Sequence, residues 1–125
     1  MKKILLCDDD GDISTLMQLI VSSMDLKFAS VQKITDIVKL VNEEKPDLIL
    51  MDLWIPDIGG EQAVKDIKAD EGIKKIPVLL FSATDKLDEI CEQIGADGCI
   101  KKPFDVSEFK TMVNTFLNSR SVSSH

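Results

Sequence analysis

The stretch KILLCDDD, residues 3–10, passes from a short apolar run directly into three aspartates. The same change from apolar to polar residues occurs in DLILMD, residues 47–52, and in PVLLFS, residues 77–82. Each apolar run is too short and too continuously apolar for an amphipathic helix. Runs of this kind are typical of strands that are buried on both faces of a sheet. The three stretches therefore predict three strands of a parallel sheet.

Weaker apolar runs predict two more strands. Residues 27–31 mix polar residues with Phe28 and Ala29, as expected of an edge strand, and residues 98–101 form a fifth run. Between and after these runs, apolar residues recur at steps of three and four, which is the period of an amphipathic helix. The helical positions are Ile13, Leu16, Met17, Ile20 and Met24; Ile34, Ile37, Val38 and Val41; Ala63, Val64 and Ile67; Leu87, Ile90, Cys91 and Ile94; and Val106, Phe109, Met112, Val113, Phe116 and Leu117.

Regular alternation of strand and helix favours a sheet of parallel strands with right-handed crossovers and helices on both faces. We therefore predict a doubly wound α/β fold with a five-stranded parallel sheet. A chain of 125 residues is close to the common size of one domain, which we place at residues 1–118. Residues 119–125 are polar and serine-rich without a helical period, and we expect them to form a flexible tail.

Charge and composition narrow the classes of partner and location. The formal net charge is -7 and the sequence pI is about 4.6, so the chain as a whole repels nucleic acid and anionic membrane surfaces. No apolar run is long enough for a signal peptide or approaches the roughly 20 residues of a transmembrane helix. Cys7, Cys91 and Cys99 lack C-x-x-C spacing and are expected to pack as reduced thiols. We therefore expect a cytoplasmic protein without membrane insertion.

The residues that follow each predicted strand are the candidates for chemistry, because ligands of open parallel sheets bind beyond the carboxyl ends of the strands. Crowded carboxylates at such an edge repel one another unless a cation lies among them. Oxygen ligands without histidine or cysteine suit a hard cation, so the pattern predicts a site for Mg²⁺. The polar residues at the strand ends are Asp8, Asp9 and Asp10; Asp52; Ser82; and Lys101 and Lys102.

A magnesium site of this kind suits phosphoryl transfer, which needs positioning and charge neutralisation more than covalent chemistry from the protein. Asp52 is the predicted nucleophile, because carboxylates can form aspartyl phosphates. Lys102 and Ser82 are each predicted to contact an oxygen of the phosphoryl group. Asp10 and Asp12 are expected instead to cap the helix that follows them.

The run DLWIPDIGG, residues 52–60, resembles the response-regulator receiver family (CheY-like) of two-component signal transduction. In that family the third strand ends in a phosphoacceptor aspartate, and an apolar residue, a proline and a glycine follow it at the spacing of Asp52, Ile55, Pro56 and Gly60. The remaining family motifs match Asp8 and Asp9 after the first strand, Ser82-Ala83 after the fourth and Lys102-Pro103 after the fifth.

The resemblance extends from about Lys3 to Leu117 and implies finer detail. It implies a flavodoxin-like sheet with strand order 2-1-3-4-5 and a cis Lys102-Pro103 bond. It also implies a signalling switch rather than an enzyme. Such a switch catalyses only its own phosphorylation and dephosphorylation. The implied partners are a histidine kinase or histidine phosphotransfer protein as phosphoryl donor and a downstream protein as target. The implied metal ligands are Asp8, Asp9, Asp52 and the backbone carbonyl of Trp54.

Three positions depart from the family pattern. Many receivers have an aromatic residue three positions before the lysine, where this chain has Cys99. An aromatic switch on the fifth strand is therefore not expected. In the family, the positions of Trp54 and Thr84 flank the route of the water that hydrolyses the phosphoryl group. Neither side chain has a carboxylate or amide to orient that water, so we expect the phosphoryl group to persist.

Two other functions are considered beside this one. The run DDDGD, residues 8–12, resembles the signature of haloacid-dehalogenase-type phosphatases, with Asp8 as nucleophile and Asp10 as acid/base group. Asp12 replaces the threonine of that signature, and the run at 52–60 would remain unexplained. The second alternative is a receiver-like interaction module that binds a partner without phosphorylation. Phosphoryl transfer to Asp52 would separate it from the main prediction.

A calcium-binding EF-hand loop is excluded. The alternate acids from Asp8 fit its first positions, but Ile13 stands where the sharp turn needs glycine. Leu19 stands where a bidentate glutamate is required.

Overall fold

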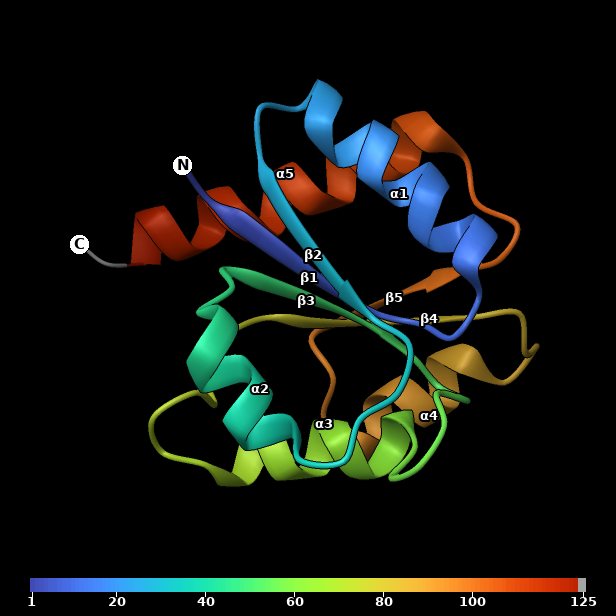
Figure 1. The fold of residues 1–125 in the computed structure, drawn as a ribbon, viewed down its shortest axis with the longest axis vertical. Helices are drawn as coiled ribbons and strands as arrows, with labels where there is room; N and C mark the ends of the chain where they lie inside the picture. The colour runs from blue at the N-terminus through green and yellow to red at the C-terminus, as the bar shows by residue number, and fades with distance from the viewer. Residues whose placement is uncertain (124–125) are drawn as a thin grey trace.

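The computed structural model describes residues 1–123, and the side chains of residues 1–118. Within this part of the chain, strands and helices alternate five times (Figure 1). The strands are β1 (Lys3–Cys7), β2 (Lys27–Val31), β3 (Leu48–Asp52), β4 (Val78–Ser82) and β5 (Gly98–Lys101). The helices are α1 (Gly11–Ser23), α2 (Ile37–Glu44), α3 (Gly60–Ala69), α4 (Leu87–Ile94) and α5 (Val106–Ser123).

All strand pairs are parallel, and the strand order is β2-β1-β3-β4-β5. The predicted doubly wound fold and the strand order implied by the family resemblance are both confirmed. The three strands predicted from continuous apolar runs, β1, β3 and β4, occupy the middle of the sheet. The weaker runs form the two edges, as their mixed polar composition suggested for β2.

Two apolar clusters lie on opposite faces of the sheet. Figure 1 shows α1 and α5 on one face and α2, α3 and α4 on the other. Successive residues of each strand point to opposite faces, so Ile4 and Leu48 pack toward α1 and α5. Their neighbours Leu5 and Ile49 pack toward the other three helices. This double burial explains why each central strand contains a continuous apolar run, with its polar residue at one end.

The helix boundaries follow local capping interactions. Asp10 caps α1, as predicted, by accepting hydrogen bonds from the backbone N–H groups of Asp12 and Ile13 at 2.9 and 3.3 Å. Asp105 caps α5 by accepting a hydrogen bond from the N–H of Glu108 at 3.0 Å. Helix α2 ends at Glu44, and its C-cap residue Lys45 adopts a left-handed conformation with φ of 51°.

The sequence prediction was wrong about the start of the second helix. Ile34 was included in its apolar period, but α2 begins at Ile37. Ile34 instead forms an isolated parallel bridge with Asp57, and its carbonyl accepts a hydrogen bond from the N–H of Ile58 at 3.3 Å. The side chain of Ile34 is buried, so the apolar period correctly predicted burial but not helix.

Helix α5 continues to Ser123, which lies within the stretch predicted to be a tail. The apolar period ends at Leu117, but residues 118–123 contain neither glycine nor proline to end the helix. The last two residues of the predicted tail, 124 and 125, lie outside the described residues. Among residues 1–123, no helix combines the length and the apolar character that a membrane crossing requires.

Candidate metal and phosphoryl site

The polar residues predicted from the strand ends meet at one edge of the sheet. In the sheet register, Asp52 lies opposite Phe81, and Ser82 lies opposite Lys101. Asp52 and Ser82 therefore lie at the ends of the neighbouring strands β3 and β4. Asp8 and Asp9 follow β1, and Lys102 follows β5, so the parallel order brings all five to the same edge.

Three carboxylates form a compact group. Asp8, Asp9 and Asp52 each offer an oxygen, and these three oxygens lie within 4.8 Å of one another. Asp8 and Asp52 are only 1% and 5% exposed, whereas Asp9 is exposed on the open side of the group. Such a set of oxygen donors fits a hard divalent cation. Asp10 serves the cap of α1, and its N–H donates a hydrogen bond to Asp8 at 2.9 Å, which orients the Asp8 carboxylate.

Lys102 brings a positive charge to this group. Its Nζ lies 2.8 Å from Asp8 Oδ2 and 3.8 Å from Asp52 Oδ1. The same Nζ lies 4.6 Å from the centre of the Phe81 ring, within the range of a cation–π interaction. The Lys102 side chain is therefore held between two carboxylates and an aromatic ring. The Lys102-Pro103 bond is cis, as the family resemblance implied.

The pKa of Asp52 is raised above its ordinary value. The largest cause is burial, followed by the negative charge of Asp8, and Asp9 adds a smaller contribution of the same sign. The charge of Lys102 and a hydrogen bond from the backbone of Trp54 lower the pKa, but they do not offset the other causes. The Asp52 anion is consequently destabilised in this site despite the Lys102 ammonium, and a further positive charge would stabilise it.

Ser82 and Trp54, the two other predicted site residues, differ in their exposure to solvent. Ser82 is 1% exposed, and its Oγ accepts a hydrogen bond from the N–H of Thr84 at 3.4 Å. Trp54 directs its ring outward, because the residue is 70% exposed. A role for the Trp54 carbonyl as a metal ligand stays a prediction, as do the roles of Ser82 and Lys102 toward a phosphoryl group.

The loop after Asp52 needs a glycine at its end. A Cβ atom on Gly60 would collide with the backbone oxygen of Asp52 and with Leu53. The N–H of Gly60 donates a hydrogen bond to the carbonyl of Leu53 at 3.1 Å, which closes the loop against β3. Gly60 therefore allows α3 to begin in direct contact with the strand that carries Asp52.

A shallow groove of about 840 Å³ opens beside Asp9. It gives the carboxylate group a solvent-facing side through which a ligand could approach. No residue at the end of β2 was among those predicted for the site, but residues that follow this strand line the groove. The lining residues are Asp9, Val31, Gln32, Lys33, Pro56 and Asp57.

Phe81 was also not among the residues predicted for the site. Phe81 belongs to the continuous apolar run of β4, and nothing in that run distinguishes it from its buried neighbours. Its contact with Lys102 depends on the register between β4 and β5, which the sequence alone does not give. Lys101, which was predicted at the same strand end as Lys102, is exposed and pairs with Asp85 at 2.8 Å outside the carboxylate group.

Comparison with known proteins identifies the family. A family model described as the response regulator receiver domain matches residues 4–114. The chain belongs to the response regulator receiver family. This receiver domain is 33% identical over 122 residues to the regulator RpaA of Synechocystis, which is described as a DNA-binding dual master transcriptional regulator. The match covers 94% of this chain and 49% of RpaA.

Two further relatives differ in length. The DNA-binding response regulator MtrA of Mycobacterium tuberculosis is 30% identical over 118 residues, covering 93% of this receiver domain and 50% of MtrA. The chain thus spans about half the length of RpaA and MtrA. The sporulation initiation phosphotransferase F of Bacillus subtilis is 29% identical over 121 residues, covering 96% of this chain and 97% of that protein.

Solved structures agree with the fold. The receiver domain of the sensor histidine kinase PA1611 from Pseudomonas aeruginosa, with magnesium coordinated in its active-site cleft, has a TM-score of 0.84 and 25% identity. The match covers 94% of this receiver domain and 98% of that chain. A response regulator from Chloroflexus aurantiacus has a TM-score of 0.86 at 20% identity, covering 94% and 98% of the two chains.

Proposed function

We propose that this receiver domain is a phosphoacceptor switch in a two-component phosphorelay, in which Asp52 accepts a phosphoryl group in a Mg²⁺-dependent reaction. The observation that carries the proposal is the group of three carboxylate oxygens within 4.8 Å of one another, with the Lys102 ammonium beside two of them. This arrangement provides a nucleophile, ligands for a cation and a fixed positive charge at one edge of the sheet. Phosphoryl transfer requires these three elements together.

The donor set fits the metal. Carboxylate oxygens of Asp8, Asp9 and Asp52 are hard ligands, and we assign the backbone carbonyl of Trp54 as a fourth. Mg²⁺ bound there would neutralise charge on the carboxylates and on the phosphoryl oxygens. Burial and the nearby negative charge of Asp8 raise the pKa of Asp52, and a bound cation would offset both effects.

In the proposed step, a carboxylate oxygen of Asp52 attacks the phosphorus of a phosphohistidine. A P–O bond forms while the P–N bond breaks, and its electron pair leaves with the imidazole. Lys102 stabilises the negative charge that develops on the phosphoryl oxygens, since its ammonium already lies near Asp52. The Ser82 hydroxyl, at the end of the strand β4 that pairs with β3, donates a hydrogen bond to another phosphoryl oxygen.

The proposed donor is a histidine kinase or a histidine phosphotransfer protein, and the proposed output is contact with a downstream protein in the cytoplasm. The similarity to a relative named as a phosphotransferase, over nearly the whole of both chains, supports a place in a relay. The domain acts as a switch because the phosphoryl group is transferred to its own residue Asp52 and not to a separate substrate. It would catalyse only the gain and loss of its own phosphoryl group.

The decisive experiment is phosphorylation with a small acyl phosphate and Mg²⁺, followed by mass mapping. Label is expected on Asp52, and Asp52→Asn is expected to abolish it. Asp57→Asn is the matched control, because Asp57 is exposed in the same loop and asparagine tolerates its φ of 76°. The control variant should be labelled like the wild type.

Two results would support the alternatives instead. Phosphate on Asp8 with repeated turnover of a phosphate ester would indicate a haloacid-dehalogenase-like phosphatase. The cap that Asp10 forms on α1 counts against its use as the acid/base group of such an enzyme. A folded chain that binds Mg²⁺ but accepts no phosphoryl group would indicate a phosphorylation-independent interaction module.

A further inference from the structure

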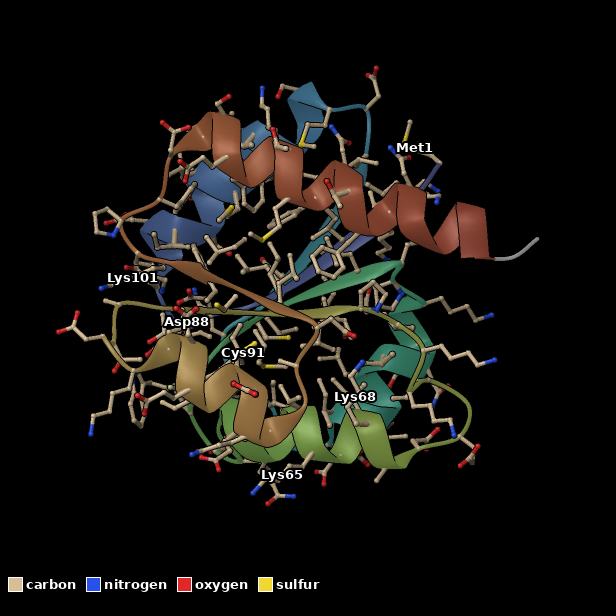
Figure 2. The ribbon with its side chains drawn as sticks, turned by 180° about the vertical axis from the view of Figure 1, so that it is seen from behind. Met1, Lys65, Lys68, Asp88, Cys91 and Lys101 are labelled. Atoms are coloured by element: carbon tan, nitrogen blue, oxygen red, sulfur yellow. The ribbon has the colours of Figure 1, made fainter. Side chains whose placement is uncertain are left out.

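Two cysteines meet where helix α4 packs against the edge strand β5. Cys91 lies on α4 and is 7% exposed, whereas Cys99 lies on β5 and is partly exposed. Cys99 packs against the apolar cluster that contains Cys91. Figure 2 shows Cys91 and Asp88 on the side of α4 that is turned toward the sheet.

Two hydrogen bonds cross between the two elements at this point. The thiol of Cys91 lies 3.2 Å from the carbonyl oxygen of Gly98, the residue immediately before Cys99. The thiol of Cys99 lies 2.9 Å from Asp88 Oδ1. Asp88 and Cys91 are three positions apart, so they share one face of α4. Cys91 therefore contacts the residue next to Cys99, and Cys99 contacts a residue one helical turn from Cys91.

We propose that Cys91 and Cys99 are a site of oxidative modification, where an intramolecular disulfide forms between α4 and β5. This proposal does not require Asp52 to accept a phosphoryl group. The reagent that would form this disulfide is a two-electron oxidant such as a peroxide. Cys7 is excluded from the pairing, because it is fully buried in β1 and belongs to the middle of the sheet.

The exposure of the two thiols assigns their order of reaction. Cys99 is the accessible sulfur, so it attacks the peroxide, and the O–O bond breaks to give a sulfenic acid and water. The sulfur of Cys91 then attacks the sulfenic sulfur, and an S–S bond forms as the S–O bond breaks and a second water leaves. Two thiols lose two electrons and two protons, and one peroxide becomes two waters.

The surroundings of the pair determine how readily it reacts. Burial and the hydrogen bond to the Asp88 carboxylate raise the pKa of the Cys99 thiol to about 12. Burial also raises the pKa of Cys91. Little thiolate is therefore present near neutral pH, and oxidation should be slow. The pair is suited to respond to a sustained oxidant rather than to a brief pulse.

Oxidation would change how α4 is held. In the reduced chain, hydrogen bonds join the thiols to Gly98 and Asp88, and such bonds can open and re-form. A disulfide would replace them by a covalent bond and release the Asp88 carboxylate. The backbone between the two cysteines, which includes the turn at Gly95, would become a closed loop.

The sequence makes the test direct. Trypsin cleaves after Lys86 and Lys101 and leaves both cysteines in one peptide, residues 87–101, while Cys7 falls in the peptide of residues 4–27. The folded chain would be treated with hydrogen peroxide, its free thiols alkylated, and the protein digested with trypsin. Mass spectrometry would then give the masses of the peptides. We expect the peptide 87–101 to lose two hydrogens and to carry no alkyl group. After a further cleavage at Glu92, the two fragments of this peptide should remain joined by the disulfide. Cys7 should carry an alkyl group.

Variants separate the proposal from unspecific oxidation. Cys7→Ala should form the same disulfide as the wild type, whereas Cys91→Ser and Cys99→Ser should form no intramolecular disulfide. Circular dichroism would verify that each variant is folded. The proposal is overturned if oxidation yields mainly disulfides between chains or to Cys7. It is also overturned if both thiols remain free in the folded chain under peroxide that joins them in the urea-unfolded chain.

Discussion

The Lys102 ammonium lies 2.8 Å from a carboxylate oxygen of Asp8, which stands 94 positions earlier in the chain. Asp8 is almost fully buried, so Lys102 compensates a charge that water does not reach. Asp52, the proposed phosphoacceptor, is the more distant partner of the same lysine at 3.8 Å. Lys102 therefore stabilises the group of three carboxylates even when no metal ion is bound. Its removal should lower the stability of the fold as well as the rate of phosphoryl transfer.

Lys102→Met should destabilise the metal-free chain by about 2 kcal/mol, because one member of a largely buried ion pair is left without its partner. Saturating Mg²⁺ should reduce the loss, since the cation supplies the missing positive charge. Lys101→Met is the matched control, because the pair of Lys101 with Asp85 is exposed and should contribute little. Urea unfolding with and without Mg²⁺ measures both variants. Equal losses would show that burial of Asp8 does not decide the result.

Asp52→Asn should stabilise the metal-free chain at neutral pH. A folded-state pKa raised above the unfolded value means that the unfolded state ionises first as the pH rises. Stability is therefore lost as the pH rises from the unfolded pKa through the folded pKa, and asparagine avoids that loss. Unfolding curves from pH 3 to 8 should show the two proteins converging at the acid end. A constant difference across this range would contradict the assigned cause.

Asp9→Asn should weaken Mg²⁺ binding about ten-fold or more, equivalent to ~1.4 kcal/mol or more. Asp10→Asn should leave the affinity nearly unchanged, because Asp10 caps α1 and asparagine caps a helix equally well. The fluorescence of Trp54, the single tryptophan, reports the titration. An equal loss in both variants would mean that the metal ligand is misassigned.

Gly60→Ala should destabilise the chain by about 1–3 kcal/mol, because the new Cβ must push the backbone of Asp52 away. Phosphoryl acceptance should fall with it, since the displaced residue is the nucleophile. Gly11→Ala is the control, as its Cβ would meet only Gln32 at an ordinary 3.6 Å. Thermal unfolding and acyl phosphate labelling measure the two effects. A Gly60→Ala chain as stable and active as the control would show that the contact is easily relieved.

The lifetime of the phosphoryl group should depend on Trp54 and Thr84. An aspartyl phosphate is lost when water attacks in line, and neither residue can orient that water. Trp54→Asn combined with Thr84→Glu should speed dephosphorylation about ten-fold or more, by supplying polar groups at these positions. Loss of label after removal of the phosphodonor gives the rate. A double variant that loses phosphate no faster than the wild type would disprove control by these positions.

The sequence predicted the site better than it predicted the extent of the helices. Asp52 could be placed at a strand end because residues 48–51, LILM, are all apolar, and a run this short is typical of a buried strand. Ile34 was misassigned because a buried residue in an irregular segment can share the period of the adjacent helix. The end of α5 was missed because polar residues without helical period can still continue a helix. The contacts of Lys102 with Phe81 and of Cys99 with Asp88 depend on register and packing, which local sequence does not carry.

The two edge strands also influence how the molecule behaves in concentrated solution. An unpaired strand edge can recruit a strand from another chain, and charged side chains discourage such pairing. The β2 edge presents the exposed residues Lys27 and Ser30, and the β5 edge ends in the exposed Lys101. The apolar β1, β3 and β4, which would aggregate most readily, are enclosed between these polar edges. The sheet is thereby protected from growth at both sides, and the chain should resist fibre formation while it remains folded.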